Sequence, residues 1–206
     1  MHYPFDTVGL TSEQVDIFQE TYEALRAKFE IEPTGHIDFH LDSFEIFTGN
    51  TEVNLKGSFV IKNAKTNCYI LFIETFDIKS YNPKNSPTSG HNYYTCALAY
   101  LKKDFGRVLI RPETLADKII ELVHPVELDF EDDKAFSDTW YVLTNDRWKA
   151  DAAMDRNFRN VVMDVRHDGV VIEIIDHTLI IGHNYIASPD AALQLADLVV
   201  RICSLC

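Results

Sequence analysis

The sequence predicts an α+β protein with a largely antiparallel sheet, and three observations support this prediction. Residues 11–29 have the periodicity of a helix, residues 52–101 contain strand-like runs separated by turn signals, and further strand and helix signals follow residue 107. The strand-like runs come in hairpin order and do not alternate strictly with helices. Such an order favours antiparallel pairing over a parallel βαβ arrangement.

The first element is a helix over residues 11–29. Thr11 and Gln14 have the spacing of a capping box, in which each side chain bonds the other residue's backbone N–H. Apolar residues recur at intervals of three and four, which places them on one face of the helix. These residues are Val15, Phe18, Tyr22, Leu25 and Phe29. Pro33 and Gly35 end the helical pattern.

A meander of four or five strands follows this helix. In residues 52–62, Val53, Leu55, Gly57, Phe59 and Ile61 alternate with Asn54, Lys56, Ser58 and Lys62, as in a half-buried strand. Residues 68–78 and 93–101 are more continuously apolar, which predicts central strands covered on both faces. Between them, residues 80–92 are rich in Pro, Asn and Ser, and we interpret them as a hairpin tip or, alternatively, a binding loop.

The second half of the chain predicts a ββαββα arrangement after a linking strand and helix. The strand precedes a helix that begins at Pro112 and Glu113, as helix N-termini prefer. The later elements are strands at 126–130 and 139–144, a helix at 147–163, a hairpin over 170–183 that turns at Asp176 and His177, and a final helix from Pro189 capped by Ser188. We therefore divide the chain into residues 1–123 and 124–206, which can together form one continuous domain.

Composition excludes several classes of function. Lys and Arg number 19 and Asp and Glu number 32, so the formal charge of −13 repels nucleic acid and anionic lipid. No basic segment followed by an apolar one opens the chain, and no apolar run reaches the roughly 18 residues of a membrane span. The four cysteines lie in apolar, patterned segments, which is typical of a reducing compartment. We expect a soluble cytoplasmic protein.

The stretch GHIDFHLD, residues 35–42, is the richest in potential metal ligands. A strand would present His36, Asp38 and His40 on one face, but Cβ atoms four residues apart on a strand are about 13 Å apart. Two imidazoles at that distance cannot share a zinc ion, whose ligand bonds are about 2 Å. We interpret the stretch as the solvated face of a strand. A metal-dependent enzyme that uses these residues is the alternative, if another segment places a ligand beside Asp38.

Other motifs indicate no catalytic residue, cofactor site or metal ligand. The acidic run at 127–133 resembles the start of a calcium loop, but Lys134 and Trp140 stand where the loop needs Gly and Glu. Cys203 and Cys206 form a C-x-x-C at the end of a helix, where the dipole raises thiol pKa values, and we expect a frayed terminus there. No phosphate-binding glycine loop or nucleophile elbow is present.

Residues 107–182 carry a set of short elements that resembles a group of uncharacterised bacterial proteins. Members of that group share an aromatic-x-Leu-Arg-Pro-Glu element, an Asp-Ile-Asp-Phe element, a Pro-x-Phe-Ser-x-x-Tyr element and a late Val-x-x-Glu strand. The matching positions here are Arg111, Pro112 and Glu113, then Leu128, Asp129 and Phe130, then Phe136 and Ser137, and finally Glu173. The resemblance implies a bacterial protein and no particular activity, because the group has none assigned.

We therefore hypothesise a binding or interaction module without catalytic activity. One alternative is an acidic immunity-type protein that neutralises a basic partner, which the charge of −13 and the acidic run at 127–133 favour. The other alternative is the metal-dependent enzyme built on His36, Asp38 and His40. The sequence indicates no oligomeric state.

Overall fold

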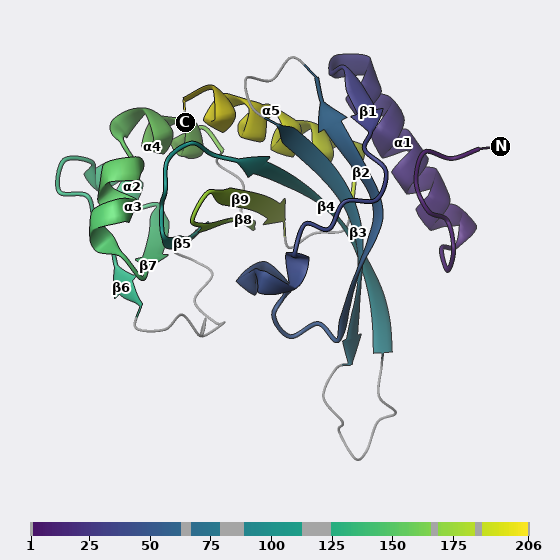
Figure 1. The fold of residues 1–206 in the computed structure, drawn as a ribbon, viewed down its shortest axis with the longest axis horizontal. Helices are drawn as coiled ribbons and strands as arrows, with labels where there is room; N and C mark the ends of the chain where they lie inside the picture. Colours follow the sequence, from purple (N-terminus) through teal and green to yellow (C-terminus); the bar gives the residue numbers. More distant parts are fainter. Residues whose placement is uncertain are drawn as a thin grey trace.

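A single antiparallel sheet organises the protein, as seen in a computed structural model that describes residues 2–62, 67–78, 89–112, 125–165, 169–183 and 187–205. Its nine strands follow the order β1-β2-β3-β4-β9-β8-β5-β7-β6 (Figure 1). Every pair of neighbouring strands is antiparallel. The predicted α+β class with a largely antiparallel sheet is confirmed.

The first part of the sheet is the predicted meander with one additional edge strand. Its strands are β1 (Ile31–Pro33), β2 (Glu52–Ile61), β3 (Cys68–Ile78) and β4 (Ser89–Tyr100). The register between β3 and β4 is continuous from Cys68 opposite Ala99 to Ile78 opposite Ser89. Of the predicted loop at 80–92, residues 80–88 lie outside the described residues, and residues 89–92 belong to β4.

The second part of the sheet contains β5 (Arg107–Pro112), β6 (Val126–Glu127), β7 (Trp140–Thr144), β8 (Val170–Ile175) and β9 (Thr178–His183). The predicted β8–β9 hairpin is confirmed, and Asp176 takes the left-handed conformation at its turn, with φ of 53°. This hairpin lies between β4 and β5, so strands from residues 1–123 and from residues 124–206 share one sheet. The helix predicted after Pro112 falls on residues 113–124, which lie outside the described residues.

Five helices accompany the sheet in the described part of the chain: α1 (Ser12–Lys28), α2 (Lys134–Ser137), α3 (Arg147–Ala153), α4 (Arg156–Met163) and α5 (Pro189–Leu205). The predicted capping box is confirmed, because Gln14 N donates to Thr11 Oγ1 and Thr11 N donates to Gln14 Oε1. The prediction of one helix at 147–163 is wrong. Asp155 interrupts it, because its carboxylate accepts the N–H groups of Asn157 and Phe158 and so starts a new helix.

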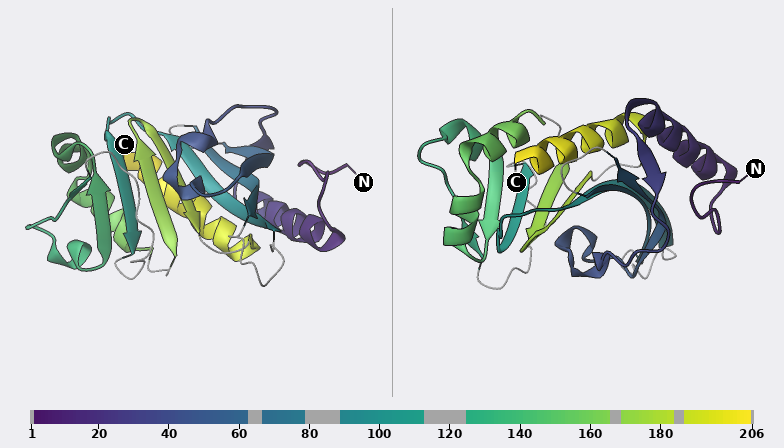
Figure 2. Two further views of the ribbon diagram at one scale, coloured as in Figure 1. Left: turned by 90° about the horizontal axis from the view of Figure 1, so that it is seen from below. Right: turned by 45° about the horizontal axis from the view of Figure 1, so that its top comes forward.

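Both faces of the sheet are covered. Helices α1 and α5 lie on one face, and the short 3₁₀ helices η1 (Leu41–Ser43) and η2 (Glu45–Phe47) lie on the other (Figure 2). Successive residues of β3 divide between the two cores: Ile70 and Phe72 pack on the helical side, and Leu71 and Ile73 pack on the 3₁₀ side. The prediction that β3 and β4 are central strands covered on both faces is confirmed.

Strand β2 departs from the alternation that its sequence predicts. The register with β3 shifts between Leu55 and Gly57, so Lys56 is an extra residue at a β-bulge. Val53 and Leu55 consequently pack against the core on the 3₁₀ side, whereas Phe59 packs on the helical side. Lys56, which the alternation predicts to face solvent, is only 8% exposed. The prediction of one apolar face along the whole strand is wrong.

We predict that Phe18→Ala lowers the free energy of unfolding by about 3–5 kcal/mol, because it removes a ring from the centre of the helical core. Phe18 is 1% exposed, and its ring stacks on that of Phe72 with centroids 4.6 Å apart. Urea denaturation followed by circular dichroism measures the loss. Trp148→Ala is the control, because Trp148 is 88% exposed and its removal should change stability by no more than about 0.5 kcal/mol.

Candidate functional site

Residues 36–40 do not form the predicted strand. They belong to no helix or strand and pair with no strand among the described residues, and Asp38 Oδ1 accepts a hydrogen bond of 2.9 Å from His40 N. His40 takes the left-handed conformation with φ of 50°, and η1 begins at the next residue. Asp favours such turns because its side chain bonds the backbone two residues ahead. The local turn therefore replaces continued strand pairing.

The side chains of this segment still divide into an apolar and a polar group. Ile37, Phe39 and Leu41 pack against the core on the 3₁₀ side. His36, Asp38 and His40 are exposed, and His40 Nδ1 lies 3.5 Å from the Asp38 carboxylate. Within the described ranges, no group of three or more His, Cys, Asp or Glu side chains is arranged to hold a metal ion. The structure brings no third ligand to Asp38 from those ranges.

The same segment forms one wall of an open groove of about 910 Å³. We call it the edge groove. Its lining consists of Asp6, residues 36–39, 41, 42 and 47–56. Side chains of a strand alternate between its two faces, yet all five consecutive residues 52–56 of β2 line this groove. The groove therefore follows the edge of β2 and is not confined to one face of the sheet.

The edge groove has an apolar floor and an acidic rim. Ile37, Leu41, Val53 and Leu55 line it as half-buried side chains. The carboxylates of Asp6, Asp38, Asp42 and Glu52 line it as exposed groups. A surface of this composition favours a ligand that presents apolar and positively charged groups together.

Among the described residues that line the groove, Lys56 is the one lysine or arginine, and groups of the same chain hold its ammonium. Its Nζ atom donates to the carbonyl oxygen of Val8 at 2.8 Å and lies 3.0 Å from Glu74 Oε2. The carboxylate of Asp6 lies farther away, at 3.6 Å, and adds an ion-pair contact. Lys56 therefore holds the N-terminal segment on the sheet, and its charge is balanced within the chain.

Glu74 is the buried counterion of Lys56 and also accepts two further hydrogen-bonding groups. Its Oε1 atom lies 3.1 Å from the Tyr93 hydroxyl and 2.9 Å from His91 Nδ1. Burial alone would raise the pKa of Glu74, but bonds from Lys56 and Tyr93 outweigh it and hold the pKa below its usual value. Burial and the Glu74 carboxylate raise the pKa of Tyr93 to about 12. Glu74 thus stays ionised and Tyr93 neutral near pH 7.

A second buried carboxylate anchors η2, whose Phe47 lines the groove. Glu173 Oε1 lies 3.0 Å from the Arg107 guanidinium, and Glu173 Oε2 accepts the N–H of Ile46 at 3.2 Å. Burial raises the pKa of Glu173, although Arg107 and backbone N–H groups oppose the shift. The same guanidinium reaches Glu45 at 3.2 Å. The pair thereby anchors η2 and the segment that precedes it.

Glycine at position 182 allows η2 to lie this close to the sheet. A Cβ atom at Gly182 would stand 2.5 Å from Ile46 Cδ1 and 3.3 Å from Cys96 Sγ. Ile46 therefore occupies the space that a side chain at position 182 would need, and a larger residue there would displace the Ile46 side chain.

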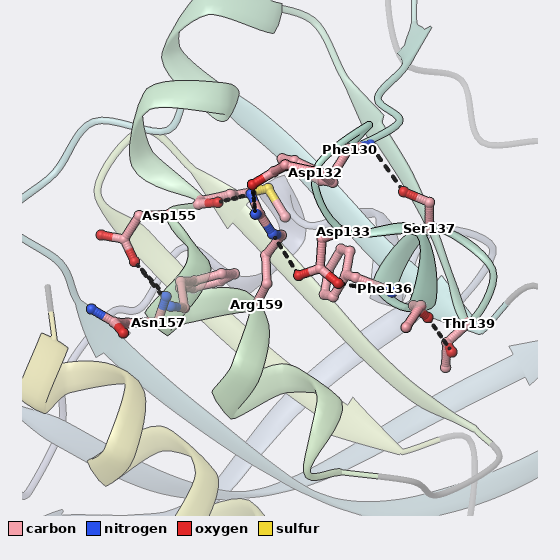
Figure 3. Close-up of polar contacts among 12 residues, drawn as sticks. Phe130, Asp132, Asp133, Phe136, Ser137, Thr139, Asp155, Asn157 and Arg159 are labelled. Atoms are coloured by element: carbon pink, nitrogen blue, oxygen red, sulfur yellow. Dashed lines mark hydrogen bonds and ion pairs between the residues drawn. The ribbon is translucent and has the colours of Figure 1, made fainter.

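The acidic run at 127–133 is less available to a partner than the sequence suggests. Arg159, which is buried, lies 2.6 Å from Asp132 and 3.1 Å from Asp133, and it also donates to the carbonyl oxygen of Met154 (Figure 3). Its guanidinium lies over the Phe130 ring, 4.3 Å from the centroid. Two carboxylates of the run therefore neutralise a cation of the same chain, while Glu127, Asp129 and Glu131 remain exposed.

The other positions that the sequence highlights have structural surroundings. Phe136 is buried, and Ser137 Oγ accepts the N–H of Phe130 at 2.9 Å (Figure 3). Arg111 lies over the Tyr141 ring, 4.7 Å from its centroid. Cys203 is buried with its sulfur 2.8 Å from that of Cys68, so the expectation of a frayed end is wrong at Cys203. Cys206 lies outside the described residues.

Sequence reasoning missed the buried ion pairs Lys56–Glu74 and Arg107–Glu173, although two signals were available. Glu74 stands within FIETF and Glu173 within VVIEII, so each carboxylate interrupts a densely apolar strand. A buried carboxylate needs a cation or hydrogen-bond donors. The identity of those partners could not be read from the sequence, because they come from other strands.

Comparison with known proteins shows a similarity of fold and no family relationship. No family model matches the chain, and no curated protein matches it. A crystal structure of the mycobacterial trehalose monomycolate transport factor A has a similar fold, with a TM-score of 0.53 and 11% identity. The similarity covers 90% of this chain and 96% of that one. No helix in the described part of the chain is long and apolar enough to cross a membrane.

We predict that Glu74→Gln lowers the free energy of unfolding at pH 7 by about 3 kcal/mol, because it removes the buried counterion of Lys56. The folded-state pKa of Glu74 lies below its ordinary value of 4.5, so the wild-type advantage is complete above that pH. The advantage should shrink as the pH falls through the folded-state pKa. Urea titrations between pH 7 and pH 3 measure this difference.

Glu52→Gln is the matched control for this pH dependence, because Glu52 is an exposed carboxylate on the neighbouring strand. It should show a small difference from wild type at each pH. A Glu74→Gln difference that stayed constant down to pH 3 would contradict the role given to the Lys56–Glu74 pair.

We predict that Arg159→Met lowers the free energy of unfolding by about 3 kcal/mol, because Asp133 and the Met154 carbonyl lose their shared donor. Arg156→Met on the same helix is the control, since Arg156 is exposed and should change stability by no more than about 0.5 kcal/mol. Thermal unfolding and urea titration of both variants provide the comparison. Equal effects would contradict the structural role given to the buried Arg159 guanidinium.

Proposed function

We propose that this protein is a non-enzymatic binding module and that the edge groove is its binding surface. The observation that carries the proposal is the groove itself: about 910 Å³, with an acidic rim, an apolar floor and a lysine that is paired with Glu74 and bonded to the Val8 carbonyl. Such a lining can hold a ligand through apolar contact and charge, and it offers no activated group with which to transform one.

The state of the titratable groups around the groove supports binding over catalysis. A nucleophile needs a neighbouring base with a free lone pair, and a general acid needs a transferable proton. Glu74 accepts from three groups, and Tyr93 donates to that carboxylate. Asp38 and Asp42 are exposed, and Asp38 accepts the backbone N–H of His40. None of these groups has the arrangement of a nucleophile, a base and an orienting residue.

The structural comparison is compatible with this proposal. The mycobacterial protein of similar fold is named as a transport factor, which is a role that depends on binding. A shared fold at 11% identity does not transfer a ligand, so the chemistry of the groove decides what this chain binds.

The charge of the groove favours a basic protein as the partner, with nucleic acid and anionic membrane surfaces disfavoured. The neutralisation of a basic partner therefore remains part of the proposal, with Asp38, Asp42 and Glu52 in the role first given to the run at 127–133. A cytoplasmic location and membership of the uncharacterised bacterial group also remain proposals. The metal-dependent alternative would need a third ligand beside His40 and Asp38.

The test places a photo-crosslinking amino acid, p-benzoylphenylalanine, at Asn54 in the groove and, as the control, at the exposed Trp148. Irradiation of cells that make each variant should give one dominant adduct at position 54 and none of that mass at position 148. Adding Leu41→Lys to the position-54 variant should remove the adduct, because it places a cation in the groove. The crosslinked molecule, once identified and purified, should bind the wild-type protein unchanged.

Two results would overturn the proposal. One is the same adduct pattern at positions 54 and 148, because a specific groove would then not be responsible. The other is chemical conversion of the purified molecule by the wild-type protein, because the protein would then be an enzyme.

A further inference from the structure

We propose that the occupant of the edge groove is an extended basic segment of another polypeptide, which adds to the sheet as a strand along the open edge of β2. This inference rests on the proposed function, because it assigns a ligand class to the same groove. It is carried by three observations: the unpaired backbone of β2, the shape of the groove around that backbone, and the charge of the rim.

The edge of β2 is open over the residues that line the groove. Pairing with β1 ends where Pro33 stands opposite Phe59. Two single bonds continue beyond it, from Thr34 N to Ser58 O at 3.0 Å and from Asp6 N to Lys56 O at 2.6 Å. No strand among the described residues pairs with this side of residues 52–55.

The bulge decides which backbone groups face this open edge. The carbonyls of Lys56 and Ser58 point outward, so the backbone of Gly57 faces β3, where it stands opposite Phe72. The backbone N–H and C=O groups of a strand point to alternate sides from one residue to the next, so in β3 those of Phe72, Glu74 and Phe76 all point towards β2. Glu74 and Phe76 stand opposite Asn54 and Glu52. Among the residues of β2 that precede the bulge, the N–H and C=O groups of Val53 and Leu55 therefore point away from β3, towards the open edge.

These four backbone groups make the groove a template for strand addition. Neither Val53 nor Leu55 has an outward backbone partner among the described residues. Residues 52–56 span about 17 Å at the strand rise of about 3.3 Å, enough for an added strand of five residues. Unpaired edges that remain reachable are the usual sites of strand addition by peptides.

The two sides of the groove specify alternating side chains on the added strand. Val53 and Leu55 point towards the 3₁₀ side, where Ile37 and Leu41 are partly buried, so the added strand should place apolar residues on that side. Asp6 and Glu52 lie with Asn54 along the remaining lining. Residues of the added strand that point towards these carboxylates should be lysine or arginine.

The rim charge also argues against a second copy of this chain as the occupant. Two β2 edges paired with each other would place two acidic rims, each containing Asp6, Asp38, Asp42 and Glu52, at one interface. Like charges at a strand pair are destabilising. A basic segment from a different polypeptide is therefore the occupant that the groove favours.

The test measures binding of a fluorescein-labelled heptapeptide, Lys-Val-Lys-Val-Lys-Val-Lys, by fluorescence anisotropy. We expect saturable binding that weakens about tenfold or more between low salt and about 0.5 M salt. The heptapeptide with Glu in place of Lys should not bind. Asp38→Asn combined with Asp42→Asn should weaken binding of the basic peptide and reduce its salt dependence.

The backbone contribution is tested with Val53→Pro, which removes an outward N–H and leaves the bonds between β2 and β3 in place. Proline is tolerated on an edge strand when its nitrogen faces outward. We expect Val53→Pro to weaken peptide binding about tenfold or more, and Val53→Thr, which keeps the N–H, to change it less than about threefold. Circular dichroism and urea titration establish that both variants fold.

A peptide control does not depend on the folding of any variant. The same heptapeptide with N-methylated valines cannot form the backbone bonds of an added strand, so it should lose binding to the wild-type protein. Equal binding of the methylated and unmethylated peptides, or of Val53→Pro and wild type, would overturn strand addition. A dimer that Val53→Pro abolishes would instead identify a second copy as the occupant and would also overturn this inference.

Failure of this inference and failure of the proposed function give different results. If no basic peptide binds while the position-54 crosslink persists, the groove is a binding surface for another class of ligand. If the specific crosslink is also absent, the groove is not a binding surface, and both proposals are wrong.

Discussion

One extra residue in β2 determines how the two sides of the protein are assembled. The bulge at Lys56 reverses the alternation of the strand, so Val53 and Leu55 pack on one side of the sheet and Phe59 packs on the other. The same bulge points Lys56 towards Glu74, beneath the N-terminal segment. Without the extra residue, the side chains of Val53 and Leu55 would point away from the core on the 3₁₀ side.

Each cover of the sheet is held by a buried carboxylate with a cationic partner. On the helical side, Glu74 and Lys56 hold the N-terminal segment, and Gly57 lets that segment approach, because a Cβ there would stand 2.9 Å from Phe5 Cβ. On the opposite side, Glu173 and Arg107 hold η2. Both carboxylates sit within the sheet, while the parts that they fix are irregular segments. These buried charges fix the position of the irregular segments, because a displaced segment would leave a buried carboxylate without its partners.

Local periodicity predicted the elements whose signals lie within one segment, such as α1 with its capping box, the β8–β9 hairpin and α5. The alternation in residues 36–42 correctly predicted which side chains pack against the core. It did not predict the backbone structure, because a strand needs a neighbouring strand, and the turn at Asp38 and His40 ends the segment instead. The helix predicted over residues 147–163 is divided at Asp155, because its carboxylate caps the start of α4. The walls of the edge groove come from residues 36–56 and Asp6. The groove could not be predicted, because its form depends on the β-bulge at Lys56 and on the anchoring of η2 by Glu173, which is far away in the sequence.

The β8–β9 hairpin lies at the centre of the sheet although it comes from the end of the chain. The second edge of β4 pairs with β9, which lies about eighty residues later in the chain, as Leu98 opposite Ile180 illustrates. Contacts between such distant segments are slow to form because a long loop must close first. During synthesis, the meander of β1–β4 therefore emerges with one edge of β4 uncovered, and that edge is paired only after residues 178–183 have left the ribosome.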